Sequence, residues 1–438
     1  MNQAVQRAKL DTQFVKSYNE LNPNQKLAVD TVEGPVIVNA GPGSGKTQIL
    51  ALRIANILRK TDTNSRNILC LTFTDGAANN MKERLFKIMG GEYARLNIFT
   101  FHAFATDIIA KNPSSFFGGN SFSPLDPISG KQIFKEIFDN IQYGNPLFGL
   151  YQSDHIYLKD TQSQISSLKK AGILPSQFQA QLLELGKFYD QINPLLNFLT
   201  ATVSAKMFGY IPDLINKIND IDVPNLIESP SYQYKRLLLE TLSLILVEAN
   251  SPKPSTKLIT DWKARFTKKL NPNQVVLSDS LILPKNLAVA QVYQNYQDKL
   301  WELGFFDFED MLVEVCRVLE DENHFWLKSF LQEQFQYILI DEFQDTNGIQ
   351  LKLVNYIIDS SIENPNIMVV GDPDQAIFKF QGAGLTNLSQ FNQKYPKSKI
   401  INLIDNYRSH QIILDFAHSL IENSNQRLGN TVKLTSQI

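Results

Sequence analysis

The sequence predicts an α/β fold in which a parallel, doubly wound sheet is interrupted by a long, mainly α-helical insert. Three features predict it. A strand, a glycine-rich loop and a helix follow one another near the N-terminus, strands and helices alternate elsewhere, and this alternation stops over residues 112–285. Strands that alternate with helices pair in parallel, because each crossover returns the chain to the same end of the sheet.

Length and composition are those of an ordinary globular protein. The chain has 438 residues, of which 43% are hydrophobic and 20% charged, enough for two to three domains. A net charge of −2 excludes a generally basic protein, so any nucleic-acid contact must use a local groove. The 2 cysteines cannot build a disulfide framework, no apolar stretch is long enough to span a bilayer, and the N-terminus lacks the apolar core of a signal peptide. We therefore expect a soluble, cytoplasmic protein without membrane partners.

Upstream of the glycine-rich loop, Asn22 and Pro23 are typical of a helix start. The short helix that they open carries Gln25. The Gln25 amide can read adenine, because it offers a donor and an acceptor together. Taken alone, an exposed glutamine on a helix usually has no such role.

The glycine-rich loop fits the phosphate-binding P-loop pattern. It follows the apolar run 36–38, precedes apolar residues at helical spacing from Gln48 to Leu58, and reads Ala40-Gly41-Pro42-Gly43-Ser44-Gly45-Lys46-Thr47. Glycines let backbone N–H groups turn toward a polyphosphate, and the helix N-terminus adds free donors and partial positive charge. Lys46 can reach the β- and γ-phosphates, and the Thr47 hydroxyl can ligate Mg²⁺. The chain is therefore predicted to bind a nucleoside triphosphate.

Two further strands are predicted at residues 67–73 and 97–101, with a helix at 74–89 between them. Ligands of such sheets lie beyond the carboxyl ends of the strands. Phe73 and His102 therefore fall on the functional edge. Taken alone, His102 would be interpreted by default as a hydrogen-bonded structural histidine.

Within residues 112–285, helices are predicted at 131–141, 231–248 and 258–270. We interpret this stretch as a helical domain inserted into the sheet domain, with its aromatic stripes as core. The sheet pattern then resumes. It continues with helices at 288–303 and from 306 to 312 onward, and with strands at 337–340, 366–370 and 399–403.

The apolar strand 337–340 ends at Asp341-Glu342, as the Walker B element of a P-loop ATPase requires. Asp341 can hold Mg²⁺ opposite Thr47, and Glu342 can orient or deprotonate the attacking water. Gln375 follows the next strand, where a neutral amide can touch the γ-phosphate or the water.

Four aromatic and basic residues near the C-terminus complete the set of candidates. Arg408 can stabilise the charge of the transition state, and Tyr407 can stack on the adenine. The spacing of Phe378 and Phe380 would place both on one side of an extended turn, where they can stack on the bases of a single strand. A core position is an equal alternative for both phenylalanines.

These motifs together resemble the superfamily-1 DNA helicases of the UvrD/Rep/PcrA type. The matching stretches occur in the same order along the chain and comprise 21–29, 40–47, 71–85, 100–105, 307–312, 340–347, 369–383 and 406–409. The run Asp-Glu-Phe-Gln-Asp-Thr-Asn at 341–347 is highly specific. Within the insert, residues 165–175 are similar to part of the family's subdomain 1B.

The resemblance implies a RecA-like domain 1A at 1–111 and 286–400, a 1B-like insert at 112–285, and the start of a second RecA-like domain, 2A, at 401–438. It implies ATP and Mg²⁺ as cofactors and ATP-driven, usually 3′-to-5′ movement along single-stranded DNA with unwinding at junctions. In this family pattern Gln25 and Tyr407 hold adenine, and Lys46, Gln375 and Arg408 contact phosphates. DNA contacts are implied near Phe73, His102, Phe378 and Phe380.

Some positions depart from the family pattern. Asp75-Gly76 stands where the family usually has Asn-Lys, Gln381 stands where it usually has Arg, and the insert is longer than in common members. Because the chain stops at Ile438, we expect an N-terminal fragment or one half of a split helicase. Such a half would hydrolyse ATP poorly alone and would need a C-terminal half or another repair protein. Two alternatives stay open: a non-motor module with ATP as structural ligand, and the helicase subunit of a helicase–nuclease.

Overall fold

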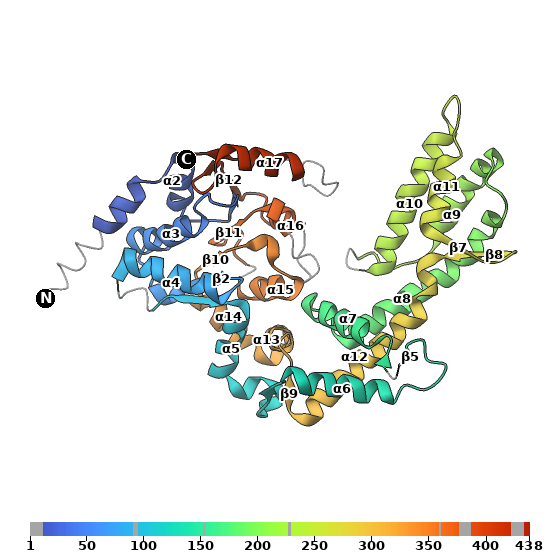
Figure 1. Cartoon of the computed structure of the whole chain (residues 1–438), viewed down its shortest axis with the longest axis horizontal. Coiled ribbons are helices and arrows are strands. Elements are labelled where there is room, and N and C mark those ends of the chain that lie inside the picture. The colour runs from blue at the N-terminus through green and yellow to red at the C-terminus, as the bar shows by residue number, and fades with distance from the viewer. Residues whose placement is uncertain are drawn as a thin grey trace. The chain divides into compact units, whose positions relative to one another are not determined.

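The computed structural model describes residues 12–90, 95–152, 154–226, 229–358, 361–375, 387–421 and 433–438. The chain divides into two compact units (Figure 1). The sheet unit comprises Met1–Leu125, Ser166–Gly172 and Gly304–Ile438, and the helical unit comprises Asp126–Ile165 and Ile173–Leu303. Residues 112–125 therefore lie with the sheet, and residues 286–303 lie with the helices.

The sheet unit is built on six parallel strands in the order β12-β1-β11-β10-β2-β3. Their bounds are β1 Val36–Ala40, β2 Ile68–Thr72, β3 Asn97–Thr100, β10 Tyr337–Ile340, β11 Ile367–Gly371 and β12 Lys399–Leu403. The predicted parallel α/β sheet is thus confirmed. Strand β12 pairs with β1 from Lys399 opposite Val36 to Leu403 opposite Ala40, so residues 401–403 belong to this same sheet.

Helices cover both faces of the sheet (Figure 1). One face packs against α2 (Pro23–Asp30), α3 (Lys46–Lys60) and α4 (Asp75–Met89). The other packs against α5 (Phe101–Lys111), α13 (Asp310–Glu320), α14 (Phe325–Gln334), α15 (Gly348–Ile357) and α16 (Asn387–Lys394). Side chains alternate along each strand, so in β10 Tyr337 and Leu339 join the first core while Ile338 and Ile340 join the second. Burial of both faces explains why the strands are continuous apolar runs.

The remaining elements of the sheet unit are short or peripheral. They are β4 Ser123–Pro124 paired with β9 Phe305–Phe306, β13 Asp405–Asn406 paired with β14 Thr435–Ser436, and α17 Gln411–Ile421. The helix predicted from residue 306 begins only at Asp310, because Phe306 pairs in β9 and the next residues form the turn before α13.

The helical unit is mainly α-helical, as the sequence predicts. Its elements are α6 Pro127–Asp139, β5 Leu150–Tyr151, β6 Asp154–His155, α7 Leu158–Lys170, α8 Pro175–Ile192, α9 Ile211–Asp220, α10 Pro230–Ala249, α11 Lys257–Phe266, β7 Thr267–Asn271, β8 Gln274–Leu277 and α12 Leu283–Leu303. The helix predicted at 258–270 is wrong beyond Phe266. Residues 267–271 form a hairpin with β8, because the Asn271-Pro272-Asn273 sequence favours a turn.

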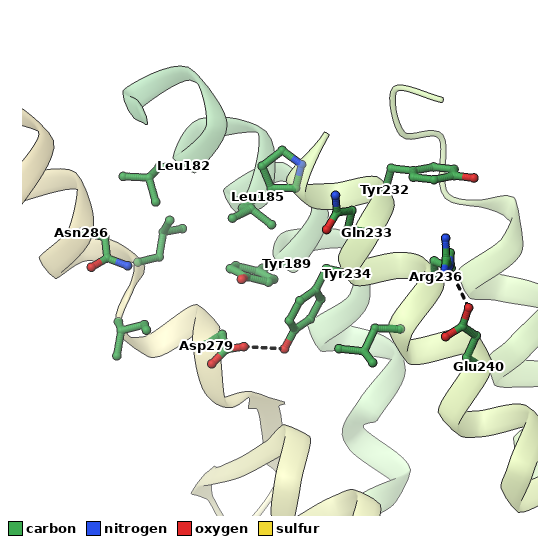
Figure 2. A pocket seen from close by; sticks show the side chains of 14 residues that line it. Leu182, Leu185, Tyr189, Tyr232, Gln233, Tyr234, Arg236, Glu240, Asp279 and Asn286 are labelled. Carbon is green, nitrogen blue, oxygen red and sulfur yellow. Dashed lines mark hydrogen bonds and ion pairs between the residues drawn. The ribbon is translucent and has the colours of Figure 1, made fainter. Parts of the chain in front are cut away.

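A pocket of about 830 Å³ lies between α8 and α10 of the helical unit (Figure 2). Two pairs of its polar side chains bond to each other: the Tyr234 hydroxyl donates to Asp279, and Arg236 pairs with Glu240. Of the predicted nucleotide and DNA residues that the structure describes, none lines this pocket. Among the described residues, no helix has the length and apolar character needed to cross a membrane.

Candidate active site

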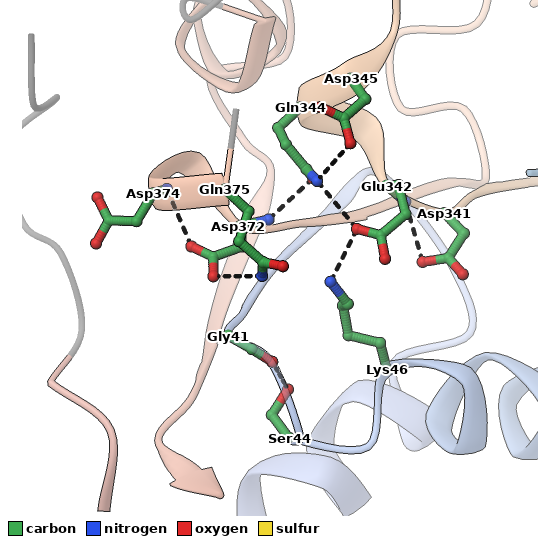
Figure 3. Close-up of polar contacts among 10 residues, drawn as sticks. All are labelled: Gly41, Ser44, Lys46, Asp341, Glu342, Gln344, Asp345, Asp372, Asp374 and Gln375. Carbon is green, nitrogen blue, oxygen red and sulfur yellow. Dashed lines mark hydrogen bonds and ion pairs between the residues drawn. The ribbon is translucent and has the colours of Figure 1, made fainter. Parts of the chain in front are cut away.

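The strand order brings three loops together at one edge of the sheet (Figure 3). Strand β11 lies between β1 and β10, so the segments that follow these three strands are neighbours. They are the glycine-rich loop after β1, residues 372–375 after β11 and residues 341–347 after β10. This is the carboxyl edge of a parallel sheet, where such folds bind ligands.

The glycine-rich loop has the backbone that a phosphate cradle needs. Gly43 and Gly45 have φ of 74° and 89°, in the left-handed region that glycine tolerates. Gly45 is the N-cap of α3 and supplies no side-chain acceptor to the first N–H groups of that helix. The Ser44 hydroxyl donates to the Gly41 carbonyl at 2.7 Å and holds the loop closed on itself. Free amides at a helix start are a site for a phosphate.

Lys46 and Glu342 meet in this site although they are 296 residues apart in the chain. The Lys46 ammonium lies 2.8 Å from Glu342 Oε2 (Figure 3). Their side chains keep 12% and 33% of their surface exposed, so both remain accessible. Glu342 also has a φ of 49°, in the left-handed region that residues with a side chain rarely adopt.

Asp341 is the buried carboxylate of the site. Its Oδ1 accepts the Glu342 N–H at 3.0 Å. Burial and the neighbouring Glu342 raise the pKa of Asp341 to about 6, against the opposing effect of Lys46. A nearby cation would favour the ionised form. A hydroxyl and a carboxylate, as supplied by Thr47 at the start of α3 and by Asp341, are donors that fit Mg²⁺.

Gln344 is the functional candidate that sequence reasoning missed. Its Nε2 donates to Glu342 Oε2 at 3.0 Å, and its Oε1 accepts the Asp372 N–H at 3.0 Å. A Cβ at Gly371 would lie 2.5 Å from that Oε1, so this approach requires glycine. Asp372 in turn accepts from Gln375 Nε2 at 2.6 Å. Gln344 thus links the Glu342 loop to the Gln375 loop (Figure 3). It lies within the stretch 340–347 that carried the resemblance, which was the available signal.

Replacing Gln344 with Leu should separate binding from hydrolysis. Leucine keeps the volume of the side chain but cannot make the bonds of Gln344 to Glu342, Asp345 and Asp372. The Glu342 carboxylate then keeps its contact with Lys46 but loses the amide that helps to fix its angle. We expect ATP affinity within about threefold of the parent and single-turnover hydrolysis slowed by about tenfold to a hundredfold. The exposed Gln336→Leu is the control. Hydrolysis at the parental rate in Gln344→Leu would remove Gln344 from the site.

The residues predicted to hold adenine lie beside the glycine-rich loop. The Gln25 amide donates to the Ser44 carbonyl at 2.9 Å. The Asn22 side chain donates to the Tyr407 hydroxyl at 3.0 Å, and the Tyr407 N–H donates to the Gly43 carbonyl at 2.9 Å. Both predicted residues are therefore brought to the P-loop.

Two other predicted residues lie close to the same loop. Arg408 is exposed, and a Cβ added to Gly43 would lie 2.6 Å from the Arg408 Cβ. Gln48, in the first turn of α3, accepts a hydrogen bond from Arg84 at 2.9 Å through its Oε1. Asn406, to which sequence analysis gave no role, donates to the Pro42 carbonyl and accepts the Arg408 N–H at 2.9 Å. Asn406 therefore docks the segment that carries Arg408.

The predicted DNA contacts are placed only in part. Phe73 follows β2 at the carboxyl edge, and Phe378 and Phe380 lie outside the described residues. His102, in the first turn of α5, stacks on Phe308 with ring centroids 3.7 Å apart and planes at 20°. Burial lowers the pKa of His102 to about 4, with Lys170 adding to this effect and Asp75 opposing it. At neutral pH His102 therefore offers an uncharged ring rather than a charge for a phosphate.

The low pKa of His102 predicts a dependence of stability on pH. Between pH 6.5 and 4 the unfolded chain takes up a proton at this position that the folded chain does not, so stability falls as the pH falls through this window. The free energy of unfolding of the parent, relative to that of His102→Phe, should decrease by about 1–2 kcal/mol from pH 7 to pH 5. Urea titrations of both proteins at each pH measure it. A difference that stays constant with pH would contradict the buried, neutral state.

Comparisons with known proteins agree with this geometry. Residues 21–396 match the family model of the UvrD/REP helicase N-terminal domain. The chain is 26% identical over 409 residues to the ATP-dependent DNA helicase PcrA of Staphylococcus aureus (strain Mu50 / ATCC 700699), covering 93% of this chain and 41% of that protein. It is 26% identical over 407 residues to PcrA of Staphylococcus epidermidis (strain ATCC 12228 / FDA PCI 1200), covering 93% and 40%.

The family match extends from Leu21, just before α2, to Pro396 in the turn before β12, and so includes the whole of the helical unit. The chain spans about two fifths of the length of the PcrA relatives that it matches. From its sequence match and its fold, the chain belongs to the family of the UvrD/REP helicase N-terminal domain.

Proposed function

We propose that this chain is the N-terminal motor half of an ATP-dependent DNA helicase or translocase that binds Mg²⁺-ATP and single-stranded DNA. The observation that carries the proposal is the 2.8 Å contact between Lys46 and Glu342, which unites the P-loop and the Walker B carboxylates across a 296-residue separation. Membership of the helicase family and the PcrA relatives support the same activity. Movement would be 3′ to 5′, with a cytoplasmic role in replication or repair.

Each residue of the site has a part in this proposal. Lys46 and the amides of the glycine-rich loop bind the phosphates, while Thr47 and Asp341 hold Mg²⁺, which when bound neutralises phosphate charge. Glu342 orients the attacking water and accepts its proton. Gln344 keeps the Glu342 carboxylate at a fixed angle, and Gln375 and Arg408 contact the γ-phosphate. Gln25 and Tyr407 hold the adenine.

The domain assignments follow the same proposal. Within the sheet unit, the part up to and including β12 corresponds to a RecA-like domain 1A and the segment after β12 to the start of domain 2A. The helical unit corresponds to a 1B-like insert. Single-stranded DNA, or its junction with a duplex, would contact Phe73, His102, Phe378 and Phe380. A C-terminal helicase half or another repair protein would supply the rest of the motor.

Nucleotide binding and turnover by the full chain test the proposal. We expect micromolar affinity for a fluorescent ATP analogue in the presence of Mg²⁺, and slow turnover that a 16-nucleotide oligo-dT raises. Binding without any turnover, with or without DNA, would favour a non-motor module that uses ATP as a structural ligand. Absence of ATP binding would overturn the proposal.

A further inference from the structure

A short segment at the end of α7 is anchored in the sheet unit by a buried lysine. Residues Ser166–Gly172 belong by their contacts to the sheet unit, while the chain on either side belongs to the helical unit. Lys169, in this segment, is 1% exposed. Its ammonium lies 2.7 Å from Asp310 Oδ1 and also donates to Asp307. A buried charge without a partner is strongly destabilising, so a lysine at this position requires the two aspartates that neutralise it.

The two aspartates are themselves fixed at the start of α13. The Asp307 N–H donates to Asp310 Oδ2 and the Asp310 N–H donates to Asp307 Oδ1, each at 3.0 Å. Burial alone would lower the pKa of Lys169, but Asp310 and Asp307 outweigh it and raise the pKa. Lys169 therefore stays charged, and the ion pair ties α7 to the first turn of α13.

The same segment also packs against the first turn of α15. A Cβ at Gly348 would lie 2.9 Å from the Ala171 carbonyl oxygen, so the two backbones touch directly. Gly172, with a φ of 75°, approaches the Ile349 side chain in the same way. Gly348 is the first residue of α15 and directly follows the loop 341–347 that carries Glu342. The position of the α7 end thus constrains the end of the catalytic loop.

The turn between Asp307 and Asp310, which Lys169 anchors, also carries the ring that covers His102. Phe308 lies between the two ends of the Asp307–Asp310 turn and stacks on His102 at 3.7 Å. Glu309, the next residue, accepts from Ser166 at 3.2 Å. One buried ammonium therefore fixes a turn that contacts the proposed DNA site and a segment that contacts the proposed nucleotide loop.

We propose that Lys169 is a positioning residue that couples the nucleotide loop at Glu342 to the DNA-contacting ring of His102. The inference rests on the proposed function, because it concerns how ATP and single-stranded DNA affect each other's binding. With the ion pair intact, the α15 start and the Phe308 turn are parts of one rigid junction. Without it, each site keeps its own side chains, but binding at one site no longer changes the affinity of the other.

A variant that lacks the three charges tests whether the ion pair positions these segments, without leaving a buried charge unpaired. Lys169→Met alone would leave the buried Asp310 and the half-buried Asp307 without this cation and destabilise the fold. The triple variant Lys169→Met, Asp307→Asn, Asp310→Asn removes all three charges while keeping the side-chain volumes similar. Lys159→Met is the matched control, because Lys159 lies on the same helix and is exposed.

Two measurements on the full chain decide the outcome. The first is the dissociation constant of a fluorescent 16-nucleotide oligo-dT, with and without saturating Mg²⁺-ATPγS. In the parent and in Lys159→Met we expect the nucleotide to change this dissociation constant by at least about fivefold, and in the triple variant by less than about twofold. The separate affinities of the triple variant for DNA and for nucleotide should stay within about threefold of the parent. A full fivefold change in the triple variant would overturn the inference.

The second measurement is hydrogen exchange of the backbone amides in the first two turns of α15, without nucleotide or DNA. We expect exchange at least about tenfold faster in the triple variant and unchanged in Lys159→Met. Exchange at the parental rate in the triple variant would overturn the inference. If the parent binds neither nucleotide nor DNA, the proposed function fails. The exchange result then decides by itself whether Lys169 positions α15.

Discussion

Glu342→Gln should slow hydrolysis severely while preserving nucleotide binding. Glutamine has the shape of glutamate but cannot accept the proton of the attacking water, and loss of a general base of this kind costs about 10²–10⁴-fold. We expect single-turnover hydrolysis to slow by about a thousandfold. Because Lys46 is paired with Glu342 at 2.8 Å, removal of that charge also frees the ammonium for phosphate. ATP affinity should therefore be equal to or tighter than that of the parent.

Single-turnover measurements with radiolabelled ATP, together with equilibrium binding, separate the two effects. Glu333→Gln, an exposed carboxylate on α14, is the control and should behave as the parent. Equal hydrolysis rates in the parent and in Glu342→Gln would mean that Glu342 is not the base, and the non-motor module would then be the better description.

Arg53→Met should cause a large loss of stability. The Arg53 guanidinium is buried at 1% exposure and donates to the carbonyls of Ala28, Thr31 and Val32 at the end of α2. Burial lowers the pKa of Arg53 to about 10, which leaves it charged at neutral pH. Methionine fills the space but leaves three carbonyl oxygens without this donor. We expect a loss of about 3 kcal/mol, since each unsatisfied buried group costs about 1–3 kcal/mol and some carbonyls find water.

Chemical unfolding of the parent and the variant measures the loss. Arg59→Met, on the same helix, is the control, because Arg59 is exposed and its guanidinium carbon lies 4.5 Å from the centroid of the Phe14 ring. Its cost should stay below about 1 kcal/mol. Since α2 carries Gln25, the ATP affinity of Arg53→Met should also fall. A stability loss equal to that of Arg59→Met would show that α2 does not depend on Arg53.

The strands and the nucleotide motifs could be predicted because their signals are local. Tyr337–Ile340 and Lys399–Leu403 are short apolar runs, and the structure has strands at these positions. The glycine-rich loop likewise lies between a strand and a helix, as its pattern requires. A run that is buried on both faces has a strong signature in sequence, because its side chains have no polar alternation.

The remaining features depend on contacts between distant residues. Nothing local marks Gln344 as the link to Asp372, because that bond exists only once β11 lies beside β10. The burial of Lys169 and Arg53 could not be predicted either. The local sequence around each is typical of an exposed residue on a helix, and their partners lie far away in the chain. The error at residues 267–271 has a different origin: lysines in a short hairpin have no apolar pattern that distinguishes a strand from a helix.

Calorimetric titration of the full chain with ATP, in the presence and absence of Mg²⁺, tests the central claim most directly. If Lys46 and Thr47 share one pocket with Asp341 and Glu342, binding should be micromolar with Mg²⁺ and at least about tenfold weaker without it. Without Mg²⁺, the Asp341 and Glu342 carboxylates face the phosphates with no divalent cation between them. Binding with the same affinity in both conditions, or no binding at all, would contradict the claim that these residues form a magnesium–nucleotide site.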